Sequence, residues 1–217
     1  YTVLASGGIG GIYRYSTNYR HLTGDAIALA LKHGIELKNT NYVQIHPTTF
    51  YTENETDRSF LISESVRGEG AVLLDKKMER FTDELQPRDV VTGEIRKQMK
   101  KDGTDFVWLS MKPIDREQLE SHFPNIVKHC REYGYNVPDD CIPVVPAQHY
   151  FMGGIKVNLE SKTSMDQLYA VGETACNGVH GKNRLASNSL LESLVFAKRA
   201  AHNMTEHELS DILDAAA

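Results

Sequence analysis

The sequence predicts a mixed α/β (α+β) protein in which one domain is interrupted by an inserted domain. Residues 1–45 give a strand, a glycine turn and a helix, and residues 148–217 return to strands and a helix. Residues 46–147 are more polar and irregular, with helical patterns near 87–101 and 115–133. Because the two outer segments resemble each other and the middle differs, we expect the outer segments to pack together around a compact insertion.

The first segment opens with an expected strand, YTVLAS, followed by the glycine turn SGGIGG. In the helix TGDAIALALKHG, Thr23 or Gly24 caps the start and Gly34 ends it. The glycine turn does not match the dinucleotide-binding pattern G-x-G-x-x-G, because Tyr13 stands where the third glycine belongs. We therefore expect the main phosphate cradle of any dinucleotide site to lie outside this chain.

The composition limits the class of protein. Its 217 residues, 41% hydrophobic and 24% charged, are typical of a soluble globular protein of one large or two small domains. The net charge of −5 gives no basic surface for nucleic acid or an anionic membrane. No apolar run approaches the roughly 18 residues of a membrane span. The cysteines Cys130, Cys141 and Cys176 fit neither a zinc site nor a disulfide framework, so we expect a reducing, cytoplasmic location.

Both ends of the sequence lead us to expect a piece of a longer protein. The chain starts without methionine inside an apparent strand that we expect to be buried, and its tail, ELSDILDAAA, reads as a helix cut at an arbitrary point. Removal of a leader by processing is the alternative.

The last segment contains the strand GGIKVN, a polar hairpin at 159–167, the strand LYAVG, and then GVHGKNRLASNSLLES at 178–193. In this final stretch Ser189 and Glu192 fit a capping box, which predicts a helix starting at Ser189. The helical period that follows places four apolar residues on one face: Leu190, Leu191, Leu194 and Val195.

The polar residues in front of this helix suggest a binding site. Asn183, Arg184 and Ser187 precede the helix start, whose N–H groups and positive dipole end favour an anion or a polarised carbonyl group. A well-capped surface helix after a loop is the alternative interpretation.

Arg88 is a second candidate for anion binding. The sequence Pro87-Arg88-Asp89 opens the helix near 87–101, where the helix dipole disfavours a positive charge by up to ~1 kcal/mol. An arginine in this position usually has another partner, such as a carboxylate ligand. Pairing with Asp83 or Glu84 is the structural alternative.

Two histidines complete the candidate site. His46 is held by a following proline in QIHPT, and His149 lies just before two glycines in HYFMGG. Together with Arg88 and Arg184 they suit a small dicarboxylate, because guanidinium groups bind carboxylates bidentately. Histidines in such settings are more often structural. No spacing of ligand residues points to a metal, and no nucleophile motif points to acyl transfer.

Six motifs follow one another along essentially the whole chain: VQIHPT, ISESVRGEGA, QPRDVV, PAQHYFMGGIKVN, LYAVGE and HGKNRLASNSLLES. In this order they resemble the succinate dehydrogenase/fumarate reductase flavoprotein family. Of its branches, ASNSLLE is most similar to the one that oxidises L-aspartate. We expect the family's N-terminal region, with the true G-x-G-x-x-G and most FAD contacts, to lie outside this chain.

The resemblance implies a role for each matching residue. Arg88 matches the arginine that transfers a proton. Five residues match the dicarboxylate-binding set, with Ser63 where threonine is usual: His46, Ser63, Glu64, His149 and Arg184. Four match FAD contacts: Asp25, Glu173, Ser189 and Leu190.

The implied fold is part of an FAD-binding domain, residues 1–45 and 148–217, interrupted by a capping domain at 46–147. The implied reaction moves a hydride from Cα of L-aspartate to FAD and forms iminosuccinate, in de novo NAD biosynthesis and with a functional link to quinolinate synthase. Oxygen or fumarate would reoxidise the flavin. We expect this chain alone to be inactive. A fumarate reductase or succinate dehydrogenase flavoprotein, acting on fumarate or succinate, is the alternative.

Overall fold

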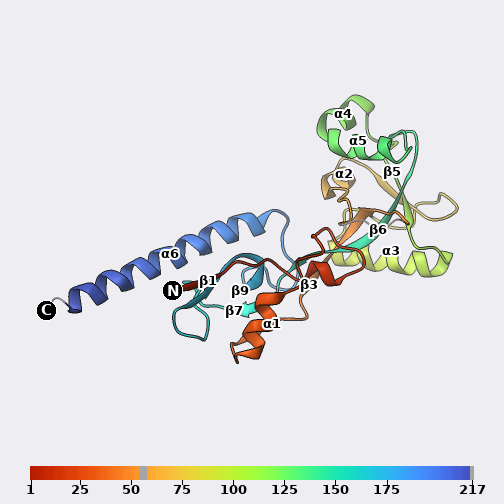
Figure 1. Cartoon of the computed structure of the whole chain (residues 1–217). Helices are drawn as coiled ribbons and strands as arrows, with labels where there is room; N and C mark the ends of the chain where they lie inside the picture. Colours follow the sequence, from red (N-terminus) through yellow and green to blue (C-terminus); the bar gives the residue numbers. More distant parts are fainter. Residues whose placement is uncertain (54–57, 216–217) are drawn as a thin grey trace. The chain divides into compact units, whose positions relative to one another are not determined.

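The structure is a computed structural model that describes residues 1–53 and 58–215 (Figure 1). The chain divides into two compact units, each described here by itself. Unit 1 consists of Tyr1–Tyr13, Tyr19–Gln44 and His149–Ala217, and unit 2 of Arg14–Asn18 and Ile45–Gln148. Residues 14–18 belong to unit 2, although the sequence analysis placed them with the first segment.

Unit 1 contains two small sheets. Strand β1 (Thr2–Leu4) runs parallel to β8 (Leu168–Ala170). In the other sheet β7 (Gly154–Lys156) lies between β2 (Leu37–Lys38), to which it is antiparallel, and β9 (Ala175–Cys176), to which it is parallel. Strand β1 is largely exposed, so the expectation of a buried first strand was wrong.

Helix α1 (Asp25–Lys32) covers the core of unit 1. Gly24 is its N-cap, in the left-handed conformation that glycine adopts without strain, and Gly34 follows its end at φ 70°. Both ends are therefore where the sequence predicts them. The apolar face of the helix packs into a cluster of Ala26, Ala30, Ile35, Ile155 and Ala170.

The polar segment 159–167 folds back on β8, as the predicted hairpin requires. The Thr163 N–H donates to the Leu168 carbonyl at 3.0 Å, and the Ala170 N–H to the Ser161 carbonyl at 3.1 Å. Two short 3-10 helices complete the unit, η1 (Gly10–Ile12) in the glycine turn and η2 (Gly172–Thr174) after β8.

Helix α6 (Asn188–Ala215) ends unit 1, and the last two residues of the predicted tail helix lie outside the described residues. The helix starts at Asn188, so Ser189 lies in its first turn and is not the N-cap. Glu192 accepts a hydrogen bond from Asn177, a tertiary contact that replaces the predicted capping box. The buried face carries Glu192, Phe196 and Ala200.

Unit 2 is built on a four-stranded sheet in the order β3-β6-β5-β4. Its strands are β3 (Val43–Phe50), β4 (Val72–Leu74), β5 (Val107–Ser110) and β6 (Ile142–Phe151). The β4–β5 and β5–β6 pairs are antiparallel. A single large apolar cluster, including Ile62, Leu73 and Leu109, fills the interior of the unit.

In the described part of unit 2, four helices surround this core, beginning with α2 (Glu64–Gly68) and α3 (Arg88–Asp102). The α3 residues Val91 and Ile95 are fully buried and face this core. The stretch near 115–133 forms two helices, α4 (Arg116–His122) and α5 (Pro124–Glu132), where we expected one. Pro124 has no N–H to continue α4, and it opens α5 at the position where proline is tolerated.

The observed mixture of sheets and helices confirms the predicted α/β (α+β) fold class. Among the described residues, none of the helices has the length and hydropathy of a membrane span.

Candidate functional site

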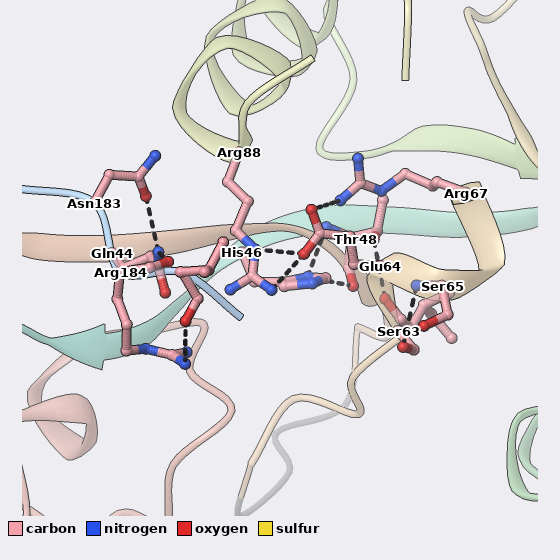
Figure 2. A network of polar contacts seen from close by, with 12 residues as sticks. Gln44, His46, Thr48, Ser63, Glu64, Ser65, Arg67, Arg88, Asn183 and Arg184 are labelled. Carbon is pink, nitrogen blue, oxygen red and sulfur yellow. Dashed lines mark hydrogen bonds and ion pairs between the residues drawn. The ribbon is translucent and has the colours of Figure 1, made fainter. Parts of the chain in front are cut away.

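In unit 2 the centre of the candidate site is an ion pair between Arg88 and Glu64 (Figure 2). Arg88 opens α3 and is buried, and Glu64 opens α2. The Nε and Nη2 atoms of Arg88 donate to Glu64 Oε2 at 2.8 and 2.5 Å. The negative Glu64 carboxylate compensates the positive charge that the helix dipole disfavours at Arg88. This partner is a side chain of the protein, whereas the sequence suggested a carboxylate ligand or, as the alternative, Asp83 or Glu84.

A second arginine, Arg67, contacts the same carboxylate, and the sequence analysis missed it. Its Nη2 lies 4.0 Å from Glu64 Oε1, and its Nη1 donates to the Glu84 carbonyl at 2.6 Å. Among the described residues, its Nε and Nη2 have no hydrogen-bond partner, although the side chain is 1% exposed. Burial lowers the pKa of Arg67, while Glu64 opposes that shift. The signal in the sequence was a charged residue inside the short helix that follows Ser63.

Ser63 and His46 are linked through a hydrogen bond between two residues close to them in the sequence, Ile62 and Thr48. Ser63 is the N-cap of α2, and its Oγ accepts from the Ser65 N–H at 3.3 Å. His46 is fully buried on β3, where its Nδ1 lies 3.2 Å from the Thr48 nitrogen. The Thr48 hydroxyl in turn donates to the Ile62 carbonyl at 3.0 Å. This bond ties the strand of His46 to the residue before Ser63.

In unit 1 the loop 178–187 carries Arg184, whose side chain is buried. Its Nη1 lies 3.4 Å from Ser189 Oγ in the first turn of α6. Gln44 donates from Nε2 to Asn183 Oδ1 at 2.8 Å and to the Arg184 carbonyl at 2.7 Å (Figure 2). The polar residues in front of this helix therefore hold the arginine loop together, in addition to any binding role.

The glycine turn of unit 1 lies against Glu173, one of the candidate FAD residues, and against the glycine that precedes Asp25, another. A Cβ added at Gly8 would lie 2.7 Å from Glu173 Cδ, so only glycine lets the backbone approach this carboxyl group. Burial raises the pKa of Glu173 to about 7, although the Phe151 N–H, which donates to its Oε1 at 2.8 Å, opposes the shift. Asp25 lies at the start of α1, where Gly24 packs against Ile9 of the same turn.

Ser189 and Leu190, the other two candidate FAD contacts, lie in the first turn of α6. Helix α6 packs on η2, which contains Glu173, and a Cβ at Gly172 would lie 3.6 Å from Ser193 Oγ. The four candidate FAD residues therefore belong to elements that meet around the glycine turn and η2 in unit 1.

The six candidates for substrate binding and catalysis fall into two groups. Unit 2 holds His46, Ser63, Glu64 and Arg88, and unit 1 holds His149, at the end of β6, and Arg184. Their assembly into one site stays a prediction. In the described part of the chain, no group of three or more His, Cys, Asp or Glu side chains could hold a metal ion.

A family model described as an FAD binding domain matches residues 1–190. The chain belongs to this FAD binding domain family. The L-aspartate oxidases of Clostridium acetobutylicum and Clostridium perfringens are similar to it, at 54% identity over 97% of the chain and 55% over 92%. This member of the family spans about half their length, 48% of the first and 45% of the second.

Solved structures of related flavoproteins have the same fold. A quinol fumarate reductase of E. coli superposes with a TM-score of 0.84 at 34% identity, covering 94% of this chain and 38% of that one. The open conformation of a flavocytochrome c3 fumarate reductase gives a TM-score of 0.65 at 27% identity, with 94% and 46% covered. The resemblance inferred from the six motifs is therefore confirmed.

The residues of unit 1 fit a flavin nucleotide. A buried carboxyl group at Glu173, which lies against the Gly8 backbone, and the first N–H groups of α6 offer polar contacts of the kind that such a ligand needs. The first four N–H groups of an α-helix have no partner within the helix, so those of α6 are suited to a ligand that gains negative charge.

Proposed function

We propose that the protein containing this chain is an FAD-dependent L-aspartate oxidase that converts L-aspartate to iminosuccinate. The observation that carries the proposal is the Arg88–Glu64 ion pair, with Arg67 on the other carboxylate oxygen, in a member of the FAD binding domain family. The 54% identity to an L-aspartate oxidase supports the choice of substrate.

The charges of this group suit a dianionic substrate. Two guanidinium groups share the single Glu64 carboxylate, which leaves a net charge of about +1 beside the buried His46 ring. In the proposal one substrate carboxylate binds near His46 and Ser63, and the other binds the fork of Arg184 with help from His149. Buried arginines hold carboxylates in a fixed orientation through paired hydrogen bonds.

Oxidation of an amine to an imine removes a hydride from Cα and a proton from the nitrogen. Arg88 would take that proton on one nitrogen while it gives another proton from Nε or Nη2 to Glu64, so the guanidinium stays cationic throughout. Glu64 is the exit to water, because its side chain is 42% exposed whereas that of Arg88 is 9% exposed.

FAD, when bound, would supply the acceptor for the hydride. Asp25 on α1 and Glu173 on η2, both next to the glycine turn, would bind FAD. The backbone N–H groups of Ser189 and Leu190 on α6 would face the flavin ring system. The raised pKa of Glu173 favours a protonated carboxyl that can donate a hydrogen bond. The FAD-binding role of residues 1–45 and 148–217 and the capping role of 46–147 belong to this proposal.

The second candidate is a fumarate reductase or succinate dehydrogenase flavoprotein. The TM-score of 0.84 to a quinol fumarate reductase favours it, and the same arginine–glutamate pair would serve proton transfer to carbon. The higher identity to L-aspartate oxidases ranks this candidate second.

A cytoplasmic location and a partner enzyme belong to the same proposal. All three cysteines are free thiols, as in proteins of reducing compartments. An imine of a dicarboxylic acid hydrolyses in water, which favours direct use by a following enzyme. We propose quinolinate synthase for that step, within de novo NAD biosynthesis.

The test is the Glu64→Gln variant of the full-length, FAD-loaded enzyme. The amide keeps the size of the side chain but cannot accept the proton, so kcat for L-aspartate should fall about 100-fold or more. FAD content should stay equal to that of the unmodified enzyme. Unchanged turnover in this variant would remove the proton-transfer role from the pair.

A further inference from the structure

The backbone of Arg184 is held by a buried glutamine. Gln44 Nε2 uses its two hydrogens on Asn183 Oδ1, at 2.8 Å, and on the Arg184 carbonyl, at 2.7 Å. Figure 2 shows this side chain directed at the loop from the start of β3. Gln44 is 3% exposed, so its bonds are shielded from competition with water. A side chain from a strand therefore helps to hold the Arg184 main chain in position.

The guanidinium of Arg184 is held separately, by an aromatic ring. Its Cζ lies 4.5 Å from the centroid of the Tyr150 ring, within the range of a cation–π contact. Both residues are buried, which strengthens such a contact. A guanidinium held over the face of a buried ring has less freedom to move, so the directions open to its hydrogen-bonding fork are restricted.

The Tyr150 ring also contacts a second ring, that of His180. The ring of His180 meets it edge-on, with centroids 5.4 Å apart at 90°. His180 Nε2 lies 3.9 Å from Glu192 Oε2, and Glu192, buried on α6, also accepts from Asn177. Burial raises the pKa of Tyr150, so the phenol stays neutral and its contact with Arg184 is that of a neutral ring with a cation.

We propose that Tyr150 and Gln44 are positioning residues that act through Arg184, Tyr150 by fixing the guanidinium plane and Gln44 by fixing the backbone. The proposal rests on the proposed function, in which Arg184 binds a substrate carboxylate. If the Arg184 guanidinium is ordered before the substrate arrives, the entropic cost of binding the substrate is lower. The expected consequence is a change in KM with little change in kcat.

The main test is a double-mutant cycle in the full-length, FAD-loaded enzyme with L-aspartate as substrate. Tyr150→Leu should raise KM about five- to thirty-fold, which is the effect of losing a buried cation–π contact, and leave kcat within about threefold. Tyr150→Phe keeps the ring and should change KM less than about twofold. In an Arg184→Leu background, Tyr150→Leu should add less than about twofold, because the group it orients is gone.

Phe196→Leu is the matched control for the ring. Phe196 is also buried in unit 1 and lies under an arginine, but this arginine is Arg199, whose Cζ lies 5.4 Å from the ring centroid. Gln44→Leu tests the backbone contact, with Gln98→Leu as its control. Gln98 is also buried, at 7% exposed against 3% for Gln44, and donates to Asp102 on α3. Both control variants should keep the original KM.

The results separate this proposal from the proposed function. If Arg184→Leu leaves KM unchanged, the proposed role of Arg184 fails. If Arg184→Leu raises KM but Tyr150→Leu does not, or raises it equally in both backgrounds, the positioning role of Tyr150 fails. Should Tyr150→Leu not fold, Gln44→Leu decides the question: an unchanged KM in that variant would overturn the proposal.

Discussion

Replacement of Arg88 by lysine tests the proton-transfer role of the pair with the positive charge kept. Arg88 donates two hydrogen bonds to Glu64 Oε2, from Nε and Nη2, and a lysine amine can replace at most one of them. The loss of one charge-assisted hydrogen bond corresponds to about 1.5–3 kcal/mol. A relay also needs one nitrogen facing the substrate and another facing Glu64, so we expect kcat to fall by about 10²–10⁴.

Ground-state binding should change much less, because the charge remains. The assay is kcat and KM for L-aspartate in the full-length enzyme, with substrate binding measured separately by titration of the flavin absorbance. Arg80→Lys is the control, since Arg80 also makes a multiple hydrogen bond to a carboxylate, that of the buried Glu84. The reasoning is refuted if Arg88→Lys loses substrate affinity and turnover in parallel, or keeps the original kcat.

Three further variants test other parts of the site. Arg184→Leu should weaken L-aspartate binding by roughly 2–5 kcal/mol, seen as a rise in KM at constant flavin content; loss of flavin would contradict the separation of roles. Gly8→Ala should displace Glu173 and lower the affinity for FAD, with an overpacking cost of about 1–3 kcal/mol. Gly93→Ala on α3 is the control, because nothing lies within 4 Å of the added Cβ, and it should leave the affinity for FAD unchanged. Equal FAD affinities in the two variants would show that the contact between Gly8 and Glu173 does not matter for FAD binding. Glu173→Gln should remove a pH dependence of stability: the folded state holds a proton up to a pKa of about 7, so the free energy of unfolding falls by roughly 3 kcal/mol as the pH rises from 4.5 to 7. Urea unfolding across this pH range checks the slope, and an identical slope in the variant would be evidence against burial of the charge.

The sequence predicted the elements whose ends carry strong local signals. Gly24 and Gly34 mark the ends of α1, and Pro87 precedes α3, because glycine and proline restrict the backbone wherever they occur. The prediction of one helix near 115–133 was wrong because the helical period continues across Pro124. Periodicity alone does not show where one helix ends and the next begins.

The apolar stripe of α6 shows that a helical period does not tell which face of the helix is buried. Its helical period is present, but the four residues of the stripe are exposed, at 74%, 62%, 72% and 41% for Leu190, Leu191, Leu194 and Val195. A period identifies a face, but the side that packs on η2 is set by tertiary contacts such as Glu192 with Asn177. Those contacts depend on residues fifteen positions apart and leave no periodic trace.

The site residues were found through motifs, and their partners were not. The sequence gives the charge of Arg88 and of Glu64, but their pairing joins residues 24 positions apart and depends on how α2 and α3 meet. Arg67 was missed because a buried arginine looks like any surface arginine in a sequence. The resemblance to the flavoprotein family gave the list of candidates, and the structure gave the contacts that make them testable.

The most direct test of the central claim is anaerobic reduction of the flavin in the full-length enzyme by L-aspartate and, separately, by succinate. The proposed function predicts that L-aspartate bleaches the flavin and yields an imine that hydrolyses to oxaloacetate and ammonia, while succinate leaves the flavin oxidised. Bleaching by succinate without bleaching by L-aspartate would contradict the proposed reaction and favour the fumarate reductase/succinate dehydrogenase alternative.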